Sequence, residues 1–178
     1  MRIMVKLMQA LTVATFVTTP FVMAQETGNF DSSGSPSNGH ALVALYQKQQ
    51  AAIDLFHAPI KSDRDLAQFQ MQHQADSPLR ALSPLNQALF LNSLKYNEKG
   101  ITTIRYDVLE SLTPTQAYQI LSLFGMQSLT PSLKLKSVSP LDEQIMSITP
   151  SLLPLKDYYC EGKGTCRQGA NQACSDGC

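Results

Sequence analysis

Apolar side chains recur at helical spacing in the middle of the chain. Between Pro114 and Phe124 they fall at positions i, i+3, i+4 and i+7, the spacing of one helix face. Thr113 stands before a proline and three residues ahead of Gln116, as in a capping box, and Gly125 stands where a helix-ending glycine belongs. These signals predict a helix over 114–124. Its apolar face is Ala117, Ile120, Leu121 and Phe124.

Four further segments show weaker forms of the same pattern. Residues 40–57 are periodic and are followed by a proline. A second helix starts at Ser62, where Asp65 completes a capping pair. Ser-Pro pairs at 83–84 and 139–140 predict two more helix starts, because proline loses no hydrogen bond in the first turn. The apolar positions that fall on one face of each are Leu42, Leu45, Tyr46, Ile53 and Phe56; Leu66 and Phe69; Leu85, Ala88 and Leu89; and Leu141, Ile145 and Ile148.

One stretch between the central helices breaks the helical pattern. Residues 97–100 form a turn-like cluster, and 101–106 are rich in β-branched and aromatic side chains. The sequence therefore predicts a mainly α fold: a single helical domain over 40–155, with one short β-hairpin at 94–106 and an irregular tail over 156–178. A small α+β fold is the alternative that this pattern leaves open.

The chain begins with the pattern of a secretory signal peptide. Arg2 and Lys6 precede an apolar stretch over 7–22, and Val22-Met23-Ala24 has the small residues of a cleavage site. We expect a signal peptide over 1–24; the alternative, a membrane anchor, is disfavoured because threonines, a glutamine and a proline dilute the stretch. Residues 25–39 are polar and rich in Gly and Ser, which is typical of a disordered linker. The protein is therefore expected to be exported, periplasmic or extracellular, without a membrane span after cleavage.

The net charge of the chain limits the classes of partner that it is expected to bind. The chain has 14 Lys and Arg against 14 Asp and Glu. Removal of residues 1–24 takes away two basic residues and leaves a net charge of −2. A balance this close to neutral, without a basic stripe, gives no basis for binding nucleic acid. Binding to a protein partner, of unknown identity, remains compatible with this charge.

All four cysteines lie in the last nineteen residues, at Cys160, Cys166, Cys174 and Cys178. In an oxidising compartment this predicts two disulfides, in any of three connectivities. A structural zinc site is the alternative, but its cysteines usually come in pairs with two to four residues between them or with a nearby histidine. Only Cys174 and Cys178 have this spacing and the histidines lie far upstream, so we expect no metal. Between Cys160 and Cys178 the tail has no Leu, Ile, Val, Met or Phe, so it needs its disulfides. Tyr158 and Tyr159 either attach the tail to the core or anchor a partner.

Few residues or motifs of the sequence indicate catalytic or ligand-binding chemistry. The sequence has no nucleophile elbow, phosphate-binding loop, zinc-protease motif, dinucleotide fingerprint or calcium loop, and we expect no cofactor. The best acid and base group is Asp54, His57, Asp63, Asp65 and His73. Asp54 and His57 are three residues apart and share a helix face, although a solvated helix edge explains them more simply.

Three functions compete at this point. The leading hypothesis is a non-enzymatic exported protein that acts by interaction, with the Cys-rich tail as a recognition loop held by disulfides. The second is a precursor that releases the tail as a small toxin or inhibitor. The third is an envelope enzyme of unrecognised type that uses Asp54 and His57.

Overall fold

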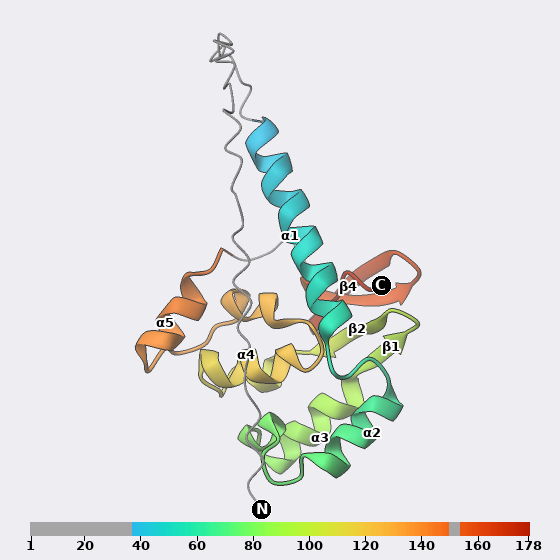
Figure 1. Cartoon of the computed structure of the whole chain (residues 1–178), viewed down its shortest axis with the longest axis vertical. Helices are drawn as coiled ribbons and strands as arrows, with labels where there is room; N and C mark the ends of the chain where they lie inside the picture. Colours follow the sequence, from blue (N-terminus) through green and yellow to red (C-terminus); the bar gives the residue numbers. More distant parts are fainter. Residues whose placement is uncertain (1–36, 150–153) are drawn as a thin grey trace, which may run out of the picture. The chain divides into compact units, whose positions relative to one another are not determined.

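The computed structural model of the chain describes residues 37–149 and 154–178 (Figure 1). The predicted signal peptide over 1–24 and most of the predicted linker over 25–39 lie outside these residues. The described residues belong to one compact unit.

Helices dominate the first part of the described chain and strands the end of it. The helices are α1 (Ser37–His57), α2 (Asp63–Gln72), α3 (Pro84–Ser93), α4 (Pro114–Ser122) and α5 (Pro140–Ser147). Short 3-10 helices lie at Pro78–Ala81, Asp107–Leu109 and Gln127–Ser132. The strands are β1 (Lys95–Asn97), β2 (Gly100–Arg105), β3 (Leu155–Gly162) and β4 (Thr165–Cys174).

The prediction of a mainly α fold with an irregular tail is wrong. The four strands form one antiparallel sheet in the order β1-β2-β4-β3. The predicted hairpin at 94–106 is β1–β2, but the tail supplies the other two strands, and β4 pairs with β2 through Cys174 opposite Thr103. The tail has few β-branched or large side chains, so its strand propensity is weak. Pairing with β2 and two disulfides stabilise the strands that this composition alone would not form.

Helix starts follow their capping residues. Thr113 Oγ1 accepts the Gln116 N–H, and Gln116 Oε1 accepts the Thr113 N–H, so the capping box of α4 is complete. Ser62 Oγ accepts the Asp65 N–H at the start of α2. Ser83 and Ser139 cap α3 and α5 in the same way. These helix starts were therefore predicted correctly.

The hydrophobic core forms where α3, α4 and β2 meet. The predicted face of α4 is fully buried, and the Phe90 and Phe124 rings meet edge to face with centroids 5.6 Å apart. Ile101 and Ile104 of β2 belong to the same cluster. In α3 the buried side chain is Phe90, while the predicted face, Leu85, Ala88 and Leu89, is exposed.

Helix α1 packs against the core through the side opposite to its predicted apolar face. Ala51 and Leu55 are buried, and α1 approaches Gly125 at the end of α4 so closely that a Cβ there would lie 2.6 Å from Leu55 Cα. From Gly39 to Gln50 no side chain is buried: Ala44 and Gln47 are partly exposed and the others are exposed. The periodicity identified one apolar face of α1, whereas packing against the end of α4 uses the other, with Ala51 and Leu55.

Asp142 joins α5 to α4. Its side chain is buried and accepts hydrogen bonds from Thr115 N (2.9 Å), Thr115 Oγ1 (2.6 Å), Val138 N (3.1 Å) and Ser139 Oγ (2.9 Å). The hydrogen bond from the Thr115 hydroxyl, with help from the other donors, holds the pKa of the Asp142 carboxyl well below its usual range.

The Asp142 site predicts acid sensitivity. A carboxyl whose folded-state pKa is depressed contributes stability that is present above its unfolded pKa of about 4 and is lost as the pH falls below it. We expect the urea midpoint of the parent chain to fall as the pH is lowered from about 5 to about 3. Asp142→Asn should lower the midpoint at pH 7 and show a smaller change on acidification. Glu143→Gln, an exposed neighbour on the same helix, is the control, and an equal acid response in parent and Asp142→Asn would contradict the prediction.

Candidate functional site

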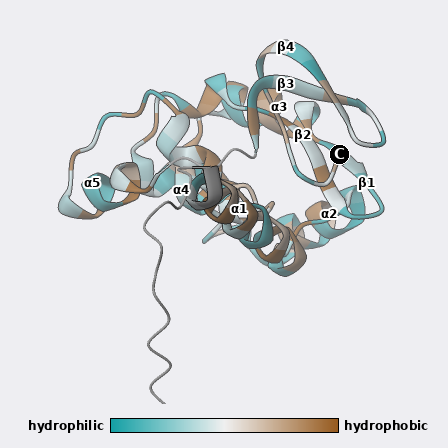
Figure 2. Cartoon of the chain, turned by 90° about the horizontal axis from the view of Figure 1, so that it is seen from above, coloured by the Kyte–Doolittle hydropathy of each residue, from teal (hydrophilic) through white to brown (hydrophobic). Residues whose placement is uncertain are grey.

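Strand β4 is sharply bent. Cys166 and Cys174 lie in this strand, eight residues apart, yet their Cα atoms are 6.1 Å apart and the two form a disulfide. Eight residues of straight strand would span about 27 Å. The β3–β4 pair therefore folds back on itself, and we call Leu155–Cys174 the folded hairpin (Figure 2).

The bend is made at Asp157 and Asn171. Both residues have a φ of 64°, in the left-handed region that Asn and Asp tolerate better than most side chains do. The register between β3 and β4 shifts at the same place, between Lys156 and Tyr158. This is the arrangement of a β-bulge, which bends a strand and increases its twist.

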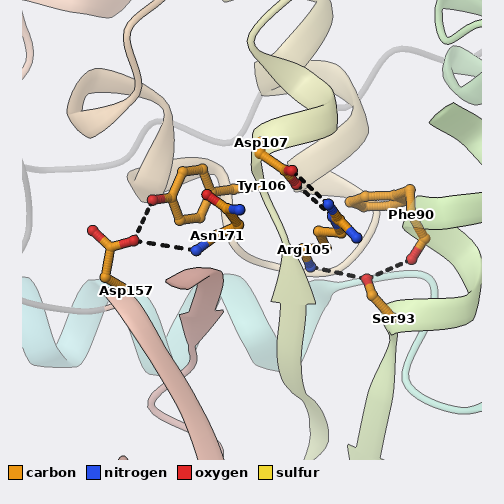
Figure 3. A network of polar contacts seen from close by, with 7 residues as sticks. All are labelled: Phe90, Ser93, Arg105, Tyr106, Asp107, Asp157 and Asn171. Carbon is orange, nitrogen blue, oxygen red and sulfur yellow. Dashed lines mark hydrogen bonds and ion pairs between the residues drawn. The ribbon is translucent and has the colours of Figure 1, made fainter. Parts of the chain in front are cut away.

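Tyr106 fastens this bend to the rest of the sheet (Figure 3). Its hydroxyl donates to Asp157 Oδ1, which also accepts the Asn171 N–H at 3.3 Å. The Tyr106 N–H donates in turn to the Asn171 carbonyl at 2.9 Å. On the other side of the network the Arg105 guanidinium donates two hydrogen bonds to Asp107, at 2.6 and 2.7 Å. Asp157 and Asn171 are thus held by the hydroxyl and the backbone N–H of Tyr106, the residue that follows β2.

The protonation states support this network. Burial raises the pKa of the Tyr106 hydroxyl, and its hydrogen bond to Asp157 raises it further. The same hydrogen bond lowers the pKa of the Asp157 carboxyl. At neutral pH the hydroxyl is therefore a donor and the carboxylate an acceptor. The arrangement fixes backbone geometry and leaves neither group poised to exchange a proton near neutral pH.

Two disulfides hold the folded hairpin in place. One joins Cys160 to Cys178 and the other joins Cys166 to Cys174. The Cys160 N–H donates to Thr103 Oγ1 at 2.9 Å, so the far end of β3 lies over β2. Within residues 37–149 and 154–178, three potential metal-ligating atoms come together at Cys166, Cys174 and Cys178, within 4.8 Å of one another. Their sulfur atoms are in disulfides rather than available as thiolates.

The bend brings two turns together around a cleft. The β3–β4 turn at Lys163 and Gly164 and the β1–β2 turn at Glu98 and Lys99 line a cleft of about 390 Å³, together with Asn97, Asp176 and Cys178. Hydrogen bonds from Gly164 N to Cys178 O (2.8 Å) and from Asn97 Nδ2 to Gly177 O (2.7 Å) hold both turns to the C-terminal segment. We call this the turn cleft.

A second cavity continues the turn cleft toward the end of α1. It has a volume of about 440 Å³ and shares Glu98, Lys99 and Asp176 with the turn cleft. Phe56 and Lys61 line its far end, where the Lys61 ammonium lies 5.0 Å from the centre of the Phe56 ring. The continuous surface therefore runs from a polar, charged end to an aromatic end.

The predicted acid and base group is not brought together. Asp54 accepts a hydrogen bond from Gln50, and Asp65 caps α2 through Ser62. His73 stacks on Phe69 and lies 3.3 Å from Asp76, while His57 packs edge-on against Phe56. Each of these residues has a local structural partner. Asp63 lies in the first turn of α2, where an acidic side chain favours the helix dipole.

Tyr158 and Tyr159 are consecutive residues of β3, and both side chains are partly buried. The Tyr159 ring covers Gly169, where an added Cβ would lie 2.6 Å from its Cδ1, and the Lys95 ammonium is 5.8 Å from its centre. Tyr159 thus packs against both the folded hairpin and β1. Their role as partner anchors stays a prediction.

Sequence reasoning missed the turn cleft. Its charged residues lie mainly in two turns that are 64 residues apart in sequence, between Lys99 and Lys163, and only the sheet pairing and the bend of the folded hairpin bring them together. The signal available was local: a charged residue beside glycine in each turn, at Lys99-Gly100 and Lys163-Gly164. Nothing in the sequence linked one turn to the other.

Comparisons with protein-family models, with curated proteins and with solved structures find no match. Among the residues that the structure describes, no helix has the length and apolar character needed to cross a bilayer. The two disulfides are compatible with an exported protein, because disulfides persist in oxidising compartments.

Proposed function

We propose that this is an exported, non-enzymatic protein that acts by binding another protein, with the folded hairpin as its recognition element. The observation that carries the proposal is the turn cleft. Two disulfides, the Asp157–Asn171 bend and hydrogen bonds to the C-terminal segment hold its walls. A surface held in its binding shape loses little conformational entropy when a partner binds.

The chemistry of the turn cleft favours a polypeptide partner. Lys99 and Lys163 line the cleft together with Glu98 and Asp176, so both signs of charge are offered. A nucleic acid would need a basic surface, and this one is balanced.

The structure argues against release of the tail as an active peptide. Ala173 and Cys174 of β4 are fully buried, and β4 is the neighbour of β2 in the sheet. Cutting before β3 would leave both β2 and the released segment with unpaired backbone groups. An enzyme built on Asp54 and His57 finds no support either, since the group around them is dispersed.

Photo-crosslinking in the producing cell tests the proposed function. A photoreactive phenylalanine at position 163 should form a covalent adduct with one defined protein, identified by mass spectrometry. The same group at position 136, an exposed lysine outside the cleft, should not form that adduct. Replacing Cys166 and Cys174 with alanine should reduce the adduct at position 163 by about tenfold or more, because the cleft loses its fixed shape. An adduct that survives this change, or that forms equally from position 136, would refute the hairpin as the recognition element.

A further inference from the structure

Helix α1 carries an unpartnered apolar stripe. Leu42, Leu45, Tyr46, Ile53 and Phe56 are 67, 63, 68, 43 and 71% exposed. At 100° per residue they fall within an arc of about 120° on one side of the helix, together with Gln49 and Ala52. We call these seven residues the α1 stripe. Figure 2 shows the brown, hydrophobic segments of α1.

The α1 stripe faces away from the core. The buried side chains of α1 are Ala51 and Leu55, which lie on the opposite side of the helix and contact the loop at Gly125. Because Ala51 and Leu55 already attach α1 to the protein, the stripe is not needed for this attachment. Apolar patches of this kind are rare on monomers and mark interaction surfaces.

The order of residues in the stripe is symmetrical about Gln49. Counting outward in both directions, apolar residues occur three, four and seven positions away. The pairs are Tyr46 and Ala52, Leu45 and Ile53, and Leu42 and Phe56. An antiparallel copy of α1 would therefore meet the stripe with apolar residues opposite each other at every level, and with Gln49 opposite Gln49.

We infer that α1 is the interface of a homodimer in which two copies pack their stripes antiparallel, with Gln49 on the two-fold axis. A two-fold interface requires one surface that is complementary to itself, and the symmetry about Gln49 meets this requirement. The amide side chain has both a donor and an acceptor, so two glutamines can bond each other at the axis. A polar residue at such a position also fixes the register of a helix pair.

The size of the stripe fits this partner. Its exposed apolar side chains offer roughly 500 Å² per copy, or about 1,000 Å² for the pair. This reaches the lower limit for a specific protein interface. A bilayer surface is the less suitable partner, because membrane-surface helices carry several Lys or Arg on the polar face and α1 has Lys48 alone.

Sedimentation velocity of the full exported chain tests the dimer. We expect a concentration-dependent dimer with a Kd below roughly 100 µM. Gln49→Glu should raise the Kd about 30-fold or more, because it places two carboxylates together at the axis, and the loss should shrink near pH 4.5 as they protonate. Lys48→Gln changes the charge by the same amount one residue away from the stripe and should leave the Kd within about twofold. Leu45→Glu should raise it about 100-fold. Circular dichroism checks that each variant is folded.

A second measurement fixes the orientation. A photoreactive phenylalanine at position 42 should crosslink to the peptide that contains Phe56 of another copy, as shown by mixing isotopically labelled and unlabelled chains. A parent chain that stays monomeric at roughly 100 µM overturns the inference, as does equal weakening by Lys48→Gln and Gln49→Glu. Crosslinks from position 42 to residues 25–36 of the same chain would show that the chain covers its own stripe. Tight binding to phosphatidylglycerol vesicles without self-association would assign the stripe to membranes. Both results would also refute the dimer.

Discussion

Gly125→Ala is expected to destabilise the protein by about 4 kcal/mol. Gly125 has a φ of +70°, and its Cβ would lie 2.6 Å from Leu55 Cα and 2.7 Å from the Asp54 carbonyl oxygen. Left-handed backbone strain accounts for about 1 kcal/mol of the loss. The remainder comes from pushing α1 away, because the obstacle is rigid backbone and separation exposes Leu55. Urea unfolding followed by circular dichroism measures this loss, which is a large part of the stability of an ordinary domain.

Two variants separate the causes of the Gly125 effect. Gly39→Ala within α1 meets no atom within 4 Å, so it should be neutral or slightly stabilising. Gly125→Asn tolerates the positive φ but carries the same Cβ, so we expect it to lose nearly as much as Gly125→Ala. Near-complete recovery in Gly125→Asn would show that contact with α1 is not the main cause.

Removal of the Cys160–Cys178 disulfide has the second largest expected effect. The bond closes a loop over a separation of 18 residues, and chain entropy predicts a loss of about 3 kcal/mol when both cysteines become alanine. The Cys166–Cys174 bond closes a loop over 8 residues and should account for about 2.5 kcal/mol. Denaturant midpoints of the two double variants provide the comparison. Losses below about 1 kcal/mol in both would show that the folded hairpin does not depend on its disulfides.

Local signals predicted where the helices begin, but not in every helix which face packs against the core. The capping box at Thr113 and the hydroxyls at Ser62, Ser83 and Ser139 act within one turn, so the sequence alone identifies each helix start. The face of α1 was different, because both of its sides are apolar. Choosing between them depends on Gly125, about 70 positions further along the chain.

The sheet was harder to predict because its pairing is non-local. β2 pairs with β4, so Thr103 meets Cys174 across most of the second half of the chain. The composition of β4 is polar and rich in small residues, which indicates a loop when read alone. The disulfides were expected, but their connectivity follows from the bend at Asp157 and Asn171, which have no sequence signature beyond a tolerance of positive φ.

The position of β4 at the far end of the sequence determines when the protein can fold. β2 lies at 100–105, yet the strand that completes its pairing is 165–174. During synthesis β2 therefore has one open edge until residues 165–174 have emerged. The bend must also form before Cys166 and Cys174 come within bonding distance, since a straight strand would keep them about 27 Å apart. Oxidation of Cys166 and Cys174 therefore comes after strand pairing, and a chain in which β4 has not yet emerged keeps the edge of β2 unpaired.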